Sequence, residues 1–168
     1  IGNSQPITVS VNNAPTPTVS ATSLQACTGQ TITLTSTSGY SYVWSNGATT
    51  QSITVNAGGS YDVTTTNSDA CNGVGVSQPV LVSVNASPTA DASFVQTNGS
   101  LTIQFLNNSS NANSYLWNFG DGNTSTSSNP NYTYAAGGDY VVTLTATNGN
   151  CTDTFTMNLT SVSVSENI

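Results

Sequence analysis

The chain lacks every basic side chain: its 168 residues include no lysine, arginine or histidine. Seven acidic residues give it a formal net charge of −7. An average domain draws about a quarter of its residues from the four charged types. Without cations the chain cannot neutralise phosphates, which excludes nucleic-acid binding as a function. It also has no polybasic patch for an anionic lipid surface.

The same absence removes most catalytic chemistry. No histidine or lysine is available as a general base, Schiff-base amine or anion clamp. Lysine–asparagine isopeptide cross-links are impossible for the same reason. Two carboxylates can hydrolyse a glycosidic bond, and Asp121 with Asp139 is the one plausible pair, but turn formation explains both. The sequence therefore predicts that the chain is not an enzyme.

Long apolar runs and helical periodicity are also missing. No stretch approaches the roughly 20 apolar residues that span a bilayer, so no membrane insertion is predicted. The chain does contain three cysteines, Cys27, Cys71 and Cys151. Disulfides persist mainly outside the cytosol, which favours an exported, extracellular protein.

An internal repeat is the strongest positive signal. Residues 5–12 read QPITVSVN and residues 78–85 read QPVLVSVN, and each copy leads into a proline-containing joint. A strand that ends one module and leads into the next is therefore present twice, as in a repeat array. The expected organisation is the last strand of a preceding module at 1–13, one module at 14–86, a second at 87–165 and the start of a linker at 166–168.

Short segments with alternating apolar residues follow one another along both modules. Turn residues such as Asn46-Gly47, Gly58-Gly59 and Gly120-Asp121-Gly122 separate them. The expected strands lie at 31–35, 42–44, 52–55, 61–65 and 80–84, and at 101–105, 115–119, 132–134, 140–145, 155–159 and 162–164. This spacing predicts an all-β chain, with tandem antiparallel β-sandwiches of the immunoglobulin-like or PKD kind in a linear array.

Four aromatic residues mark corresponding positions in the two modules. Trp44 and Trp117 each lie mid-strand among alternating apolar residues, which predicts core tryptophans between two sheets. Stacking on a carbohydrate is the alternative for these rings. Tyr61 and Tyr140 each follow a pair of glycines, and we expect the ring to be buried and the hydroxyl to return to the backbone, as in a tyrosine corner.

The order Cys27, Trp44, Cys71 resembles the cysteine–tryptophan–cysteine order of immunoglobulin domains. This resemblance predicts a disulfide between Cys27 and Cys71. Cys151 holds in the second module the place that Cys71 holds in the first, but its module has no second cysteine. We therefore expect Cys151 to be free or paired outside this chain.

The aspartates have no basic partner anywhere in the sequence. Each must be solvated, hydrogen-bonded to a neutral donor or bound to a cation. Asp121 lies between two glycines and is explained as a turn former. Asp121 and Asp139 are also the candidates for calcium ligands, although no segment has the spacing of a known calcium loop. No cofactor is predicted otherwise.

The second module resembles the PKD domain family. Residues 117–122 read WNFGDG and resemble its W-[DN]-F-G-D-G signature, residues 129–134 resemble its P-x-H-x-Y element, and residues 138–145 resemble its G-x-Y-x-V-x-L-x strand. Tyr132 stands where the family often has histidine, and Asn118 stands where aspartate is commonest. The resemblance implies a β-sandwich and carries no catalytic residue to this chain.

The first module is similar to immunoglobulin-like or PKD-like repeats of cell-surface proteins from the Bacteroidetes, on the pattern of residues 43–55 and 59–63. That resemblance implies a stalk of a very long adhesin, of the gliding-motility type, exported by the type 9 secretion system to the bacterial cell surface. Its partners would be neighbouring repeats of the same chain, the export and surface-anchoring machinery, and surface polysaccharide.

Two other functions stay open at this point. One is a module that binds a glycan or a protein, with Tyr40, Tyr42 and Tyr132 as the candidate exposed aromatics. The other is an accessory region of a secreted hydrolase, because such modules often follow catalytic domains.

Trypsin is expected to leave the unfolded and reduced chain intact, because no lysine or arginine is present for it to cleave after. Mass spectrometry after digestion in denaturant checks this. A protease that cleaves after aromatic residues is the control and should fragment the chain. Any tryptic fragment would contradict the prediction.

Overall fold

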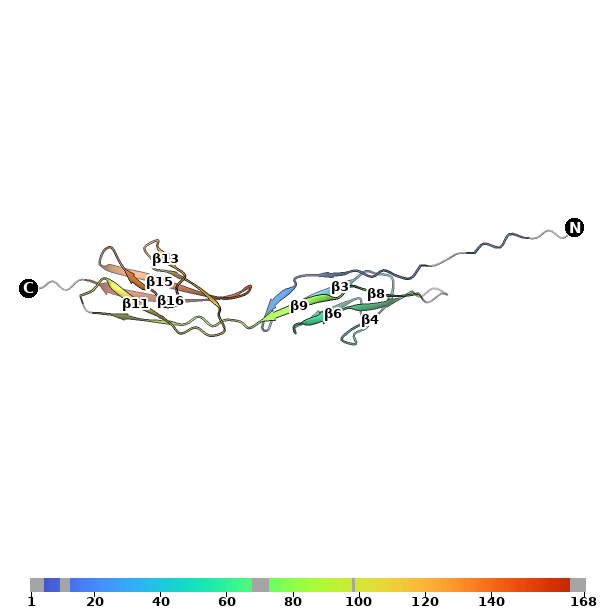
Figure 1. Cartoon of the computed structure of the whole chain (residues 1–168), viewed down its shortest axis with the longest axis horizontal. Coiled ribbons are helices and arrows are strands. Elements are labelled where there is room, and N and C mark those ends of the chain that lie inside the picture. The colour runs from blue at the N-terminus through green and yellow to red at the C-terminus, as the bar shows by residue number, and fades with distance from the viewer. Residues whose placement is uncertain (1–4, 10–12, 68–72, 98, 164–168) are drawn as a thin grey trace, which may run out of the picture. The chain divides into compact units, whose positions relative to one another are not determined.

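The structure is a computed structural model that describes residues 5–9, 13–67, 73–97 and 99–163. These residues form antiparallel β-strands and their connections (Figure 1), which confirms the all-β prediction. No helix long and apolar enough to cross a membrane occurs in this part of the chain.

The chain divides into two compact units. The first unit contains the residues up to Gln25 together with Gln30–Ser83. The second contains Ala26–Gly29 together with the residues from Val84 onward. A hydrogen bond explains why Ala26–Gly29 groups with the second unit: the amide N–H of Thr28 donates to the carbonyl of Asn85 at 2.9 Å. Sequence periodicity does not reveal such a long-range assignment.

Three small sheets form the first unit, with the strand orders β1-β3-β5, β4-β7-β8 and β2-β9-β6. The last two residues of β2 and the last two of β9 group with the second unit. The strands are β1 (Val19–Ala21), β2 (Gln25–Cys27), β3 (Ile32–Ser36), β4 (Ser41–Trp44), β5 (Ser52–Val55), β6 (Gly59–Tyr61), β7 (Val63–Thr66), β8 (Val74–Val76) and β9 (Val80–Asn85).

The core of the first unit follows from the alternation of its strands. In β3 every second side chain is buried, and Ile32 and Leu34 are almost fully enclosed. Side chains on one face of a strand recur every second residue, so one face of the sheet is apolar. Trp44, Val63 and Val82 contribute further buried side chains from the other two sheets.

The proline-containing segment before β1 packs against the first unit. Pro15 and Pro17 are buried, and a side chain at Gly75 in β8 would collide with the carbonyl oxygen of Pro15. Residues 5–9 form no strand, and Ile7 and Val9 are exposed. The other residues of the predicted N-terminal strand include 1–4 and 10–12, which lie outside the described residues, as does the predicted linker at 166–168.

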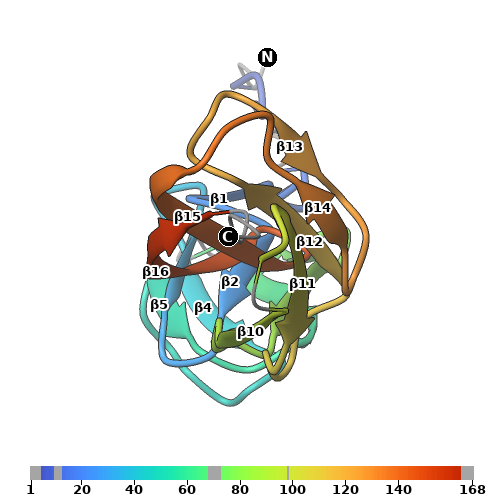
Figure 2. The same ribbon diagram turned by 90° about the vertical axis from the view of Figure 1, so that its left-hand side faces the viewer.

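The second unit has two sheets, with the strand orders β10-β11-β14 and β13-β12-β15-β16. β15 and β16 form a long antiparallel hairpin that pairs from Gly138 with Val162 to Asn148 with Cys151, and β10 lies beside β11 (Figure 2). The strands are β10 (Ala92–Gln96), β11 (Thr102–Asn107), β12 (Ser114–Asn118), β13 (Thr124–Ser125), β14 (Asn131–Thr133), β15 (Gly138–Asn148) and β16 (Cys151–Val162).

Aromatic rings fill the centre of the second unit. Phe105 lies 5.3 Å, between ring centroids, from both Trp117 and Phe119, a separation typical of favourable aromatic pairs. The buried residues around them come from both sheets: Ala92, Ile103, Tyr134, Val142, Leu144, Leu159 and Val162. The core therefore lies between the two sheets, as in a β-sandwich.

The disulfide differs from the predicted one. The sulfur of Cys27 is bonded to that of Cys151, with the two Cα atoms 5.7 Å apart. The predicted Cys27–Cys71 bridge is therefore wrong, and so is the expectation that Cys151 is free or paired outside the chain. Cys71 lies outside the described residues. The pairing arises because Thr28, next to Cys27, is hydrogen-bonded to Asn85, and the β15–β16 turn brings Cys151 to the same place.

Two glycines in the loop after β12 form a matched pair for a stability test. Gly120 and Gly122 both have left-handed backbone angles, with φ of +84° and +94°. A Cβ atom at Gly120 would lie 2.5 Å from the carbonyl oxygen of Val141, whereas a Cβ atom at Gly122 would meet nothing within 4 Å.

We expect Gly122→Ala to destabilise the second unit by about 1–2 kcal/mol, the cost of a left-handed non-glycine residue. Gly120→Ala should cost about 1–3 kcal/mol more, because the β15 backbone must move. Urea unfolding followed by Trp117 fluorescence in a Trp44→Phe background measures both free energies. Equal losses in the two variants would refute the close approach of Gly120 to β15.

Candidate functional site

The loop between β12 and β13 is shaped by hydrogen bonds from its backbone to its own side chains. The carboxamide oxygen of Asn118 accepts the amide N–H of Gly120 at 2.9 Å. The carboxylate of Asp121 accepts the amide N–H of Asn123 at 3.0 Å. Asparagine and aspartate favour such turns because their short side chains reach the backbone two residues ahead. The turn role predicted for Asp121 is therefore the role that this residue has in the structure.

Tyr132 in β14 connects this loop to the rest of the unit. Its hydroxyl donates to Oδ2 of Asp121 at 2.6 Å and accepts from Nδ2 of Asn123 at 2.7 Å. Its ring lies parallel to that of Phe119, with centroids 3.9 Å apart and planes 8° apart. One face of the Tyr132 ring is thus covered, and its hydroxyl already has two partners. A sugar ring could not stack on the covered face.

These contacts change the acidity of both groups. Partial burial acts to raise the pKa of Asp121, but hydrogen bonds from Tyr132 and Asn123 outweigh it and lower the pKa below its usual value. The hydrogen bond to Asp121 raises the pKa of Tyr132, because the phenol loses this bond when it ionises. Hydrogen bonding to the charged carboxylate therefore stabilises the loop while Asp121 is ionised.

The row of aromatic rings continues from Tyr132 into the core. Tyr134 meets the Tyr132 ring edge-on at 4.9 Å and stacks on Tyr140 at 3.9 Å. The hydroxyl of Tyr134 donates to the carbonyl of Phe119 at 2.9 Å. Burial raises the pKa of Tyr134, and the negative charge of Asp121 adds to this effect. The row therefore ties the loop to the core of the second unit.

The structure gives the two candidate calcium ligands different partners. Asp121 belongs to the loop described above, whereas Oδ1 of Asp139 accepts the amide N–H of Ser161 at 2.8 Å. The described residues contain no group of three or more histidine, cysteine, aspartate or glutamate side chains that could hold a metal ion. They also form no pocket. Each carboxylate has a neutral donor as its partner.

The landmark aromatic residues have matching contacts in the two units. The indole N–H of Trp44 donates to the carbonyl of Thr50 at 2.8 Å, and that of Trp117 donates to the carbonyl of Ser127 at 3.0 Å. Trp44 is 2% exposed and Trp117 is fully buried, so neither ring is accessible to a carbohydrate.

The two landmark tyrosines also match. The hydroxyl of Tyr61 donates to the carbonyl of Ala57 at 3.0 Å, and the hydroxyl of Tyr140 donates to the carbonyl of Ala136 at 2.8 Å. In both units the hydroxyl thus returns to the backbone four residues earlier in the chain. The two units therefore share one plan at the level of single hydrogen bonds.

Of the other two candidate binding aromatics, Tyr40 directly precedes β4 and Tyr42 lies within it. Both side chains are partly exposed. The hydroxyl of Tyr42 donates to the carbonyl of Thr37 at 3.1 Å. Tyr132 is partly exposed as well, but one face of its ring is covered by Phe119.

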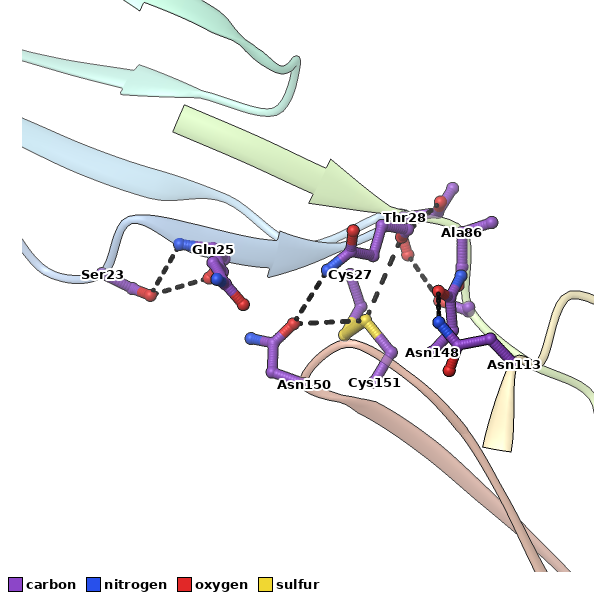
Figure 3. The surroundings of a disulfide bond; sticks show 11 residues. Ser23, Gln25, Cys27, Thr28, Ala86, Asn113, Asn148, Asn150 and Cys151 are labelled. Atoms are coloured by element: carbon purple, nitrogen blue, oxygen red, sulfur yellow. Dashed lines mark hydrogen bonds between the residues drawn. A yellow bond between two sulfur atoms is a disulfide. The ribbon is translucent and has the colours of Figure 1, made fainter. Parts of the chain in front are cut away.

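Asparagines surround the disulfide (Figure 3), and the sequence did not single them out. Nδ2 of Asn85 donates to Oδ1 of Asn150 at 3.4 Å, and Nδ2 of Asn148 donates to the carbonyl of Ala86 at 2.9 Å. A side chain at Gly149 would collide with Asn85. The run Asn148-Gly149-Asn150-Cys151 is a turn signal next to a cysteine, which is the one local hint of this site.

A family model described as the PKD domain matches residues 85–161. The PKD1 domain of Vibrio anguillarum Epp is 31% identical over 48% of this chain and 99% of that chain, with a TM-score of 0.43. The PKD1 domain of the Vibrio cholerae metalloprotease PrtV is 35% identical over 45% and 96% of the two chains, with a TM-score of 0.41.

A carbohydrate-binding module structure from the β-sandwich superfamily is 28% identical over 47% of this chain and 36% of that chain, with a TM-score of 0.43. No curated protein matches the chain.

Replacing Asp121 with asparagine should lower the melting temperature at pH 7 and have no effect in acid. A carboxyl whose pKa is lowered by folding stabilises the protein above its unfolded pKa, and this contribution is lost as pH falls through the folded pKa. The test is thermal unfolding of the wild type and Asp121→Asn between pH 7 and pH 2.

In a Tyr132→Phe background, Asp121→Asn should lower the melting temperature at pH 7 by less than it does in the wild type. The reason is that Tyr132→Phe already removes the main donor to the carboxylate. Asp91→Asn, at an exposed aspartate, is the control and should change little. A gap between the wild type and Asp121→Asn that persists unchanged at pH 2 would contradict this account.

Proposed function

The chain belongs to the PKD domain family through residues 85–161, and we propose that it is a structural segment of a longer extracellular protein, in which β-sandwich modules act as spacers. The observation that carries the proposal is the repetition of one plan in both units, in which Trp44 corresponds to Trp117 and Tyr61 to Tyr140. Repeated modules of this kind build elongated proteins whose length follows the number of modules.

The second copy of the repeated octapeptide supports a role in joining modules. It contains β9, whose Val82 pairs with Gly59 of β6 in the first unit. The chain then continues into the second unit at Val84. Residues 5–12 closely repeat the sequence of this segment, and we propose the same joining role for them.

The chemistry of the chain is compatible with an exposed, exported location. The disulfide between Cys27 and Cys151 favours an oxidising compartment. A surface without basic residues offers no site to trypsin-like proteases. The resemblance of residues 43–55 to Bacteroidetes surface repeats extends the proposal to a stalk of a gliding-motility type adhesin, exported by the type 9 secretion system and anchored at the cell surface.

Small-angle X-ray scattering of the whole chain tests the linear arrangement of modules. A compact single domain of 168 residues has a radius of gyration of about 15 Å. Two sandwiches in a line should raise the radius to about 20 Å. A measured value near that of a single globule would overturn the spacer proposal.

The alternative is an accessory module that binds a glycan. The partly exposed rings of Tyr40 and Tyr42 favour it, because aromatic faces are suited to stacking on sugars. Specific binding on a glycan array that is lost in Tyr40→Ala and Tyr42→Ala, but retained in Tyr42→Phe, would support this alternative. Absence of specific binding by the wild type would count against it.

A further inference from the structure

The disulfide closes an unusually long covalent loop. Cys27 and Cys151 are 124 positions apart in the sequence. The loop of residues 28–150 contains every strand from β3 to β15. Only the chain before Cys27 and the chain after Cys151 lie outside it.

We propose that this disulfide is a mechanical bypass that carries tension past the folded modules. In an array, tension enters the segment at one end and leaves it at the other. With the bond intact, the continuous covalent path runs through Cys27, across the two sulfurs to Cys151, and on through β16. Residues 28–150 form a side loop off this covalent path, and tension reaches them through strand pairs such as β1–β3 and β15–β16. This inference rests on the proposed spacer function, which puts load on both ends.

The part of the load path that follows Cys151 can lengthen only a little under tension. After Cys151 it follows β16, which is already an extended strand paired with β15 along its length. A strand rises about 3.3 Å per residue, close to the fully extended limit of the chain. Tension between the two ends of β16 therefore lengthens it little, even if its hydrogen bonds to β15 break.

On the other side of the bond, the described part of the load path contains two short strands, β1 and β2. β1 has three residues, and β2 ends at Cys27 itself. Detaching these two strands releases the chain that precedes Cys27 and then stops at the disulfide. The bond thus sets an upper limit on how far the segment can extend.

The surroundings of the disulfide keep the two cysteines in place. Cys151 is 2% exposed. The hydroxyl of Ser87 donates to the carbonyl of Thr28 at 3.3 Å, and Asn85 is bonded to both Thr28 and Asn150. These contacts join the segment after Cys27 to the turn before Cys151 (Figure 3) and so hold the two cysteines side by side.

Single-molecule stretching of the whole chain between handles at its two termini tests the bypass. We expect the oxidised chain to extend only through the residues outside the loop. Dithiothreitol reduces the disulfide to two thiols and is itself oxidised to a cyclic disulfide. After this reaction, unfolding should release roughly 400 Å of additional contour length, the extended length of the 28–150 loop.

Three variants make the outcome specific. Cys151→Ser should show the full extension without any reductant, as should Cys27→Ser. Cys71→Ser is the matched control and should behave as the wild type, with the same gain on reduction. A gain of roughly 150 Å, the extended length of residues 28–70, would instead indicate a bond from Cys27 to Cys71 and would overturn the proposal. Full extension of the oxidised wild type would overturn it as well.

The two proposals fail in different experiments. Stretching measures which residues bear tension and gives the same answer whatever the parent protein does. Scattering measures whether the modules are arranged in a line and does not depend on the bond. A compact chain with a working bypass would refute the spacer function alone, and an elongated chain that unfolds fully when oxidised would refute the bypass alone.

Discussion

Each β-sandwich depends on one tryptophan packed between its sheets. Trp44 and Trp117 contribute the largest buried side chains, and each indole N–H is satisfied by a carbonyl of a nearby loop. A buried ring of this size stabilises through its area, but its N–H would be costly without a partner. The hydrogen bond that satisfies the N–H holds the loop residue, Thr50 or Ser127, against the core. The same contact recurs in both units, although their strands are grouped into sheets differently.

The absence of basic residues determines how the carboxylates are held. Asp121 takes donors from Tyr132 and Asn123, Asp139 takes the amide of Ser161, and Asp153 takes the amide of Ala90 at 2.8 Å. Backbone amides and neutral side chains thus do what ion pairs do elsewhere. Such contacts depend less on ionic strength than surface ion pairs, which salt screens. Each of these three carboxylates accepts a hydrogen bond from a backbone amide and so holds a segment of the backbone in place.

The disulfide gives the segment a covalent limit that hydrogen bonds cannot supply. Strand pairs separate under sufficient tension, whereas the bond between Cys27 and Cys151 holds until it is reduced. Hydrogen bonds among Thr28, Asn85 and Asn150 hold the segments that carry the two cysteines together. The proposed spacer function fits the composition, in which serine, threonine and asparagine dominate and chemically active residues are few.

Alternation of apolar residues by itself determined the all-β fold, because side chains on one face of a strand recur every second position. The turn at Asp121 followed in the same way, because its geometry depends on neighbours two residues away. The motif of residues 117–122 also identified the family. Only the tertiary structure decided the partner of Cys27, the grouping of Ala26–Gly29 with the second unit and the stacking of Tyr132 on Phe119. These contacts join residues far apart in the chain, and local periodicity holds no information about which distant segments meet.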